Sequence, residues 1–145
     1  MTTDEDKADL AKKAWSLMFG YLLETNPERS QVLSSRDLTP NDSRALWHLD
    51  QYEERPIGSL ARDWGCDPSN ATFIVNRLTR AGLAERRSDP NDGRVKLVVL
   101  TEMGARLRRE LLEEFQVPPA SMCELPKADL TRLIDILRKL PRIKE

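Results

Sequence analysis

The sequence has few of the residues that build metal centres and disulfide frameworks. It contains one histidine, His48, and two cysteines, Cys66 and Cys123, which lie far apart in the chain. No zinc-binding spacing of cysteine and histidine is present, and two isolated cysteines do not make a disulfide framework. We therefore expect no metal and no cofactor, and we expect a protein of the reducing cytoplasm.

Long apolar runs are also missing. No run approaches the roughly 20 residues that a membrane span needs, and the first residues, MTTDEDKADLAKK, carry no apolar signal segment. The sequence also has no phosphate-cradling glycine loop, no paired nucleophile and base, and no cluster of metal ligands. These absences argue against a membrane protein, a secreted protein and an enzyme.

The charge is close to balanced overall but unevenly distributed. The formal net charge is −1, yet residues 56–109 carry 10 Lys or Arg and 6 Asp or Glu, whereas residues 1–55 carry 7 and 11. A basic middle segment between acidic flanks either meets an anionic partner or arises by chance.

Apolar periodicity and helix start signals predict a mainly helical chain. Asn26-Pro27, Thr39-Pro40 and Asp67-Pro68 each place a capping residue before a proline, and Gly65 and Gly82 each follow a helical segment. The expected helices cover residues 5–25, 26–34, 39–54, 57–64, 67–81, 101–114 and 127–140, and the expected strands cover 83–87 and 95–100.

The middle of this pattern predicts a DNA-binding unit. The helices over 57–64 and 67–81 are separated by only a few residues, as in a helix–turn–helix, whose second helix enters the DNA major groove. A hairpin follows, with the polar tip SDPNDG between its strands. The fold class is therefore mainly α with a small β-hairpin, in the order of a winged helix–turn–helix.

The terminal helices have apolar faces that lie outside this central unit. In the first helix these positions include Leu10, Leu17 and Leu22, and in the last they include Leu130 and Leu137. An apolar helix face needs a partner, so we expect a homodimer. We assign residues 38–104 to the winged helix–turn–helix domain and residues 1–37 and 105–145 to dimerisation helices.

The stretch 56–104 resembles the winged helix–turn–helix core of the MarR family of bacterial transcriptional regulators. The most specific part is Leu78…Ala81-Gly82-Leu83…Arg86…Asp89-Pro90…Asp92-Gly93-Arg94…Leu100-Thr101…Gly104. Leu38-Thr39…Ala45-Leu46-Trp47…Leu49 resembles the family's second helix, and Leu125-Pro126…Leu130…Leu133…Leu137…Leu140 its final dimerisation helix. The piece over Asn26–Ser34 departs from the commoner pattern.

The resemblance implies a homodimer that binds a pseudo-palindromic operator in double-stranded DNA. Such regulators are usually repressors and often respond to small aromatic or anionic effectors. The alternative is a constitutive or architectural winged-helix DNA-binding dimer without a ligand, which the sequence cannot separate from the first interpretation.

The start of the second helix supplies the predicted base-reading side chains. Asp67 is the expected N-cap, and Phe73, Ile74 and Leu78 are apolar positions. Asparagine can pair with adenine, serine and threonine bind bases or phosphates, and arginine can bridge guanine. The predicted DNA contacts of this helix are Ser69, Asn70, Thr72, Asn76 and Arg77, with Arg80 facing the DNA backbone or solvent.

The hairpin supplies one further predicted contact. A narrow minor groove attracts arginine, and the resemblance gives this role to Arg94, two residues after Asp92. Arg86 is expected either to contact DNA or to brace the wing by pairing with Asp92 or Asp89.

The sequence defines the effector site less clearly than it defines the DNA contacts. The resemblance places ligands between the dimer helices and the winged unit, where Trp15, Phe19, Trp47 and His48 are candidates, although most aromatic residues at helical spacing belong to a core. Cys66 adjoins a helix N-terminus, which lowers the pKa of thiols. The sensing cysteines of the family lie in the first helix, which has none here, so we do not expect redox sensing.

Overall fold

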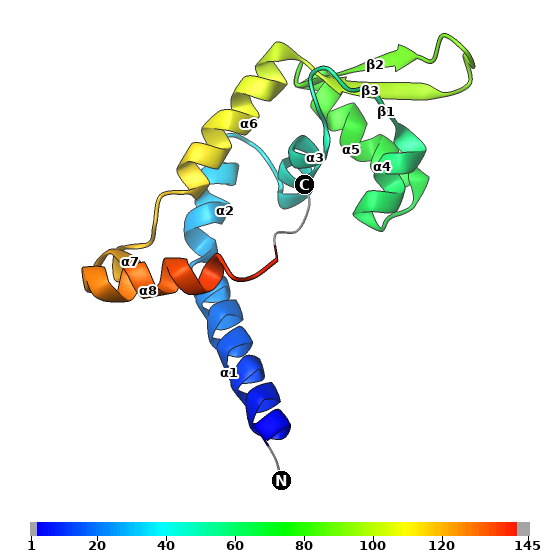
Figure 1. Cartoon of the computed structure of the whole chain (residues 1–145). Coiled ribbons are helices and arrows are strands. Elements are labelled where there is room, and N and C mark those ends of the chain that lie inside the picture. The colour runs from blue at the N-terminus through cyan, green and yellow to red at the C-terminus, as the bar shows by residue number, and fades with distance from the viewer. Residues whose placement is uncertain (1–2, 142–145) are drawn as a thin grey trace. The chain divides into compact units, whose positions relative to one another are not determined.

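The computed structural model describes residues 3–141 of the chain. The chain forms two compact units, Met1–Phe115 and Gln116–Glu145 (Figure 1). No helix in the described part of the chain combines the length and the apolarity of a membrane span. The first unit holds the predicted helix–turn–helix and hairpin.

Two helices open the chain, as predicted. α1 covers Thr3–Glu24 and α2 covers Asn26–Ser34. The predicted cap is wrong, because Thr25 rather than Asn26 stands at the N-cap of α2, and it makes no capping bond there. The Thr25 hydroxyl donates instead to the Tyr21 carbonyl at 2.8 Å, back into the preceding helical turn.

The apolar side of α1 is uncovered in the single chain. Leu10 is 64% exposed, Trp15 62% and Leu17 67%. α1 runs away from the rest of its unit in Figure 1. The predicted apolar face is therefore present and lies against solvent.

α3, over Pro40–His48, begins with the predicted signal at Thr39. The Thr39 hydroxyl accepts the Asp42 N–H at 3.2 Å, and the Asp42 carboxylate accepts the Thr39 N–H at 2.8 Å. This reciprocal pair is a capping box, which satisfies N–H groups that the first turn of a helix leaves free. The Asp42 side chain that closes this box is also buried, with 2% of it exposed.

The predicted end of this helix, at residues 53–54, is wrong. α3 ends at His48, and Leu49 is already extended. The Asp50 carboxylate accepts the N–H groups of Tyr52 and Glu53 at 2.7 and 3.1 Å, so a turn replaces the next helical turn. Tyr52, which lies within the predicted helix over 39–54, is 87% exposed.

The helix–turn–helix forms as predicted from α4, over Ile57–Trp64, and α5, over Pro68–Arg80. Gly65 ends α4 at φ +61°, a left-handed conformation that favours glycine. Asp67 stands at the N-cap of α5 as predicted, but its side chain makes no capping bond there. Its backbone carbonyl accepts the Asn70 N–H at 3.0 Å.

The predicted hairpin consists of β2, over Ala84–Ser88, and β3, over Lys96–Leu100, paired antiparallel. A third strand, β1, covers Arg55–Pro56 and pairs with β3 on its other edge, giving the order β1-β3-β2. Two residues carry no periodicity, so β1 had no signal in the sequence. In Figure 1 the hairpin tip extends beyond α4 and α5.

α6, over Glu102–Phe115, packs on the core of the first unit. Gly104 allows α6 to approach the hairpin, because a Cβ there would lie 2.0 Å from the Leu83 carbonyl oxygen. An ion pair between Arg36, in the turn after α2, and Glu114 links that turn to α6. The largest fully buried apolar side chains are those of Leu46, Leu49, Leu60, Val75, Leu78, Val98, Val99 and Leu111.

The described part of the second unit, residues 116–141, contains two helices, α7 over Ala120–Cys123 and α8 over Lys127–Leu137. α7 was not predicted, and α8 ends three residues before the predicted Leu140. Ile134, Ile136 and Leu137 of α8 are about half exposed. The last helix thus also presents apolar side chains to solvent.

Candidate nucleic-acid interface

α5 has one buried face and one outward face. Ala71, Ile74, Val75 and Leu78 are at most 3% exposed, and they recur at the spacing of one helix face. The opposite positions hold Ser69, Phe73, Asn76 and Arg80. Ser69, Phe73 and Arg80 are exposed and Asn76 is half-buried, and the exposed Asn70 and Thr79 flank this outward face.

Four of the five predicted contacts on α5 are without internal partners. The side chains of Ser69, Asn70, Thr72 and Asn76 make no hydrogen bond to any residue in the range 3–141. Ser69 and Asn70 are exposed, and Thr72 and Asn76 are half-buried. Their donors and acceptors are free to bind an external group.

The fifth predicted residue, Arg77, has a partner inside the protein. Its Nε and Nη2 atoms donate to the two carboxylate oxygens of Asp42 at 3.2 and 2.9 Å. The Asp42 side chain is 2% exposed, whereas that of Arg77 is 40% exposed. Its guanidinium thus ties α5 to α3, and its predicted contact with DNA stays a prediction.

Asp42 and Arg77 each stabilise the charged form of the other. Burial opposes ionisation of Asp42, but hydrogen bonds from Arg77 and Thr39 outweigh it and hold the pKa of the carboxyl below its usual range. The hydrogen bond to Asp42 in turn raises the pKa of Arg77. The pair is thus ionised at neutral pH and fixes the angle at which α5 meets α3.

The wing tip is shaped by two aspartates. The Asp89 carboxylate accepts the Asn91 N–H at 2.8 Å, and the Asp92 carboxylate accepts the Arg94 N–H at 3.1 Å. Both are turns in which a side chain replaces a backbone acceptor. The Arg94 guanidinium, in contrast, makes no hydrogen bond or ion pair within the described residues, and it is exposed.

The predicted pairing of Arg86 with Asp89 or Asp92 is wrong. Arg86 donates to the Thr72 carbonyl of α5 at 3.5 Å, a long contact that joins the wing to the helix. Its neighbour Arg87 points to the other face of β2, as alternation requires, and binds Glu54 and Glu85 at 2.8 and 3.1 Å. Asp92 does shape the wing, but through the backbone of Arg94.

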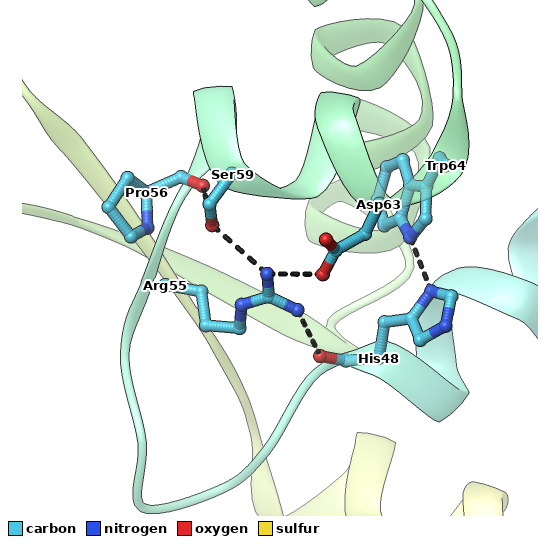
Figure 2. A network of polar contacts seen from close by, with 6 residues as sticks. All are labelled: His48, Arg55, Pro56, Ser59, Asp63 and Trp64. Atoms are coloured by element: carbon cyan, nitrogen blue, oxygen red, sulfur yellow. Dashed lines mark hydrogen bonds and ion pairs between the residues drawn. The ribbon is translucent and has the colours of Figure 1, made fainter. Parts of the chain in front are cut away.

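A polar network fixes α3 against α4 (Figure 2). Arg55 donates to the His48 carbonyl at 3.3 Å, to the Ser59 hydroxyl at 3.2 Å and to the Asp63 carboxylate at 2.5 Å. The Trp64 indole N–H donates to His48 Nδ1 at 2.7 Å. The bond from Arg55 holds the pKa of Asp63 below its usual range. The network positions the first helix of the helix–turn–helix.

The predicted effector residues fall into three contact groups. Trp15 and Phe19 stack on each other with ring centroids 6.3 Å apart, and both are exposed on α1. Trp47 contacts Phe115 at 6.1 Å, and His48 stacks on Trp64. Their joint role as a pocket lining stays a prediction.

Both cysteines are free thiols, Cys66 half-buried against the core and Cys123 exposed. In the part of the chain that the structure describes, no three His, Cys, Asp or Glu side chains gather as a metal site.

Sequence reasoning did not single out Asp42, although a signal was present. Thr39 and Asp42 have the spacing of a capping box, but a capping residue on a helix start is ordinarily solvent-exposed. Its burial and its bond to Arg77 follow from the packing of α3 on α5, which the sequence pattern does not specify.

Comparison with known proteins places these features in a family context. The model of the MarR family matches residues 38–96. The HTH-type transcriptional repressor IacR of Pseudomonas putida is 30% identical over 116 residues, covering 77% of this chain and 68% of that protein.

Two solved structures have the same fold. The YusO protein from Bacillus subtilis has a TM-score of 0.71 at 21% identity, covering 96% of each chain. The S. aureus MepR–DNA complex has a TM-score of 0.64 at 22% identity, covering 84% of this chain and 98% of that one. At this identity the likeness establishes the winged-helix architecture.

Proposed function

The chain belongs to the MarR family, and from this premise we propose that it is a homodimeric, sequence-specific DNA-binding transcriptional regulator. The relative IacR is a transcriptional repressor, and MepR, which shares the fold, is seen bound to DNA. We extend both properties to this chain.

The observation that carries the proposal is the set of free polar groups on one winged unit. The outward side chains of α5 and the guanidinium of Arg94 have no partners among the described residues. In contrast, Arg77 and Arg87 form ion pairs with carboxylates of the same chain. Unpaired donors on the helix and an unpaired cation at the wing tip match the needs of base edges and phosphates.

The proposed geometry gives each element one role. α5 enters the major groove, where Ser69, Asn70, Thr72 and Asn76 contact bases or phosphates. Arg94 enters the flanking minor groove. Arg77 acts mainly by holding α5 against α3, and Arg86 by holding the wing against α5.

The uncovered apolar surfaces support dimerisation. α1 and α8 each expose large apolar side chains, and covering such surface with a second copy is favourable. A two-fold dimer presents two α5 helices, which suits a pseudo-palindromic operator. We propose that a small aromatic or anionic effector releases the repressor from this operator.

Selection of bound duplexes from a random DNA pool tests the DNA-binding proposal. We expect enrichment of a pseudo-palindromic sequence whose half-sites lie about one helical turn apart. Pools that stay random after repeated rounds would contradict a sequence-specific regulator.

Release from the selected operator tests the effector proposal separately. Small phenols and aromatic acids are added to the preformed complex, and DNA release is followed by fluorescence anisotropy. Release by none of them would favour the constitutive dimer over the ligand-responsive repressor.

A further inference from the structure

Phe73 is the exception on the outward face of α5. Its side chain is 60% exposed, whereas the neighbouring apolar residue Ile74 is 3% exposed. The rest of this face is polar, with Ser69 and Asn76 one helical turn before and after Phe73. The one large apolar group of the face thus stands in the middle of the proposed reading surface.

We propose that Phe73 determines specificity by contacting the 5-methyl group of a thymine in the major groove. This inference rests on the proposed DNA-binding function. In the major groove only thymine offers a methyl group, and phenylalanine is among the side chains that contact it. The polar residues Ser69, Asn70 and Asn76 of the same helix carry no methyl group that could replace this contact.

The position of Phe73 fits such a contact. It is the sixth residue of α5, counted from Pro68, and the N-terminal part of a recognition helix is the part that meets base edges. The Thr72 carbonyl beside it accepts a bond from Arg86 of the wing. The ring is therefore carried on a helix that is held from both sides, by Arg86 on β2 and by the Arg77–Asp42 pair.

Substitution of thymine by deoxyuridine tests the proposal, because it removes only the methyl group. Each symmetric thymine pair of the selected operator is replaced in turn, and the Kd of the full-length protein is measured by fluorescence anisotropy. Burial of one methyl group corresponds to about a fourfold change in affinity. We expect the wild-type protein to lose about this factor per half-site at one thymine position.

The variants F73A and N70A separate the contact from a general loss of binding. F73A is expected to bind the thymine and uracil operators equally at that position, whereas N70A is expected to keep the uracil penalty. F73L retains apolar area and is expected to keep part of it. Because Phe73 is exposed, thermal unfolding of F73A should match that of the wild type.

Three results would overturn the inference while leaving the proposed function in place. They are a wild-type protein insensitive to every uracil substitution, an F73A protein with the full uracil penalty, and an F73A protein whose oligomeric state differs from the wild type. Absence of any selected sequence would overturn the proposed function itself, and this inference with it.

Discussion

Asp42 shows how much one residue contributes to the placement of α5. It accepts bonds from Thr39 and from Arg77, so it both begins α3 and ties α3 to α5. D42N is expected to lower the free energy of unfolding by about 1–3 kcal/mol at pH 7, because it removes a capping acceptor and a charged pair. Urea denaturation measures the change.

The pH dependence of this loss follows from the sign of the pKa shift. The folded-state pKa of Asp42 lies below its ordinary value of 3.8. The ionised carboxyl therefore stabilises the fold above that value, and the stabilisation disappears as the pH falls through the folded-state pKa. The difference between wild type and D42N should shrink below about pH 4. E85Q, which alters an exposed pair, is the control and should change stability by less than about 1 kcal/mol.

Gly104 is required by close approach rather than by backbone conformation. A Cβ at this position would lie 2.0 Å from the Leu83 carbonyl oxygen, a backbone atom that has little freedom to move. G104A is expected to destabilise the protein by about 1–3 kcal/mol, as overpacking does. Thermal unfolding measures the effect.

The matched control for Gly104 is Gly58, which lies in α4, where an added Cβ would have no neighbouring atom within 4 Å. G58A should be neutral or slightly stabilising, since alanine favours the helix. Equal stability losses in G104A and G58A would contradict the steric explanation.

At the scale of elements, the wing is expected to contribute through Arg94. R94A should weaken binding across most DNA sequences and reduce the slope of log K against log salt concentration by about one, because one cation leaves the interface. R87A is the control, since Arg87 is already bound to Glu54 and Glu85. An R94A protein with the wild-type affinity and salt slope would remove Arg94 from the interface.

Elements with strong local signals were predicted well. α4, α5 and the hairpin agree with the expectation to within a residue or two, because Gly65, Gly82 and proline starts mark their ends. The end of α3 was wrong, because a side-chain turn at Asp50 competes with an apolar pattern that continues past it. β1 exists only through its pairing with β3, which no local pattern encodes.

At the scale of the whole molecule, the apolar side of α1 is expected to hold the dimer. L17D places a charge on this side and should shift the protein toward monomer, with loss of operator binding, as measured by sedimentation velocity and anisotropy. S16D is the matched control, because Ser16 adjoins Leu17 but lies among the polar positions of the same helix. A dimer as stable in L17D as in S16D would exclude this face.

The individual residues of the candidate site could be predicted from the sequence, but the hydrogen bonds that join them to other elements could not. The free groups of α5 and the cation at Arg94 follow from helix spacing and from the hairpin motif. The partners of Arg77, Arg86 and His48 do not, since each bond joins elements that are distant in the sequence.

The sequence by itself determined where the helix–turn–helix and most of the other helices lie and which of their faces are apolar, because these depend on local capping, turn residues and periodicity. Only the tertiary structure decided which polar groups are used internally. Because α3 packs against α5, the Arg77 guanidinium pairs with the Asp42 carboxylate. Ser69, Phe73 and Asn76 stay on the outward face of α5. The reason is physical: a local pattern can set the direction of a side chain, but a partner across the core is chosen only when the helices pack.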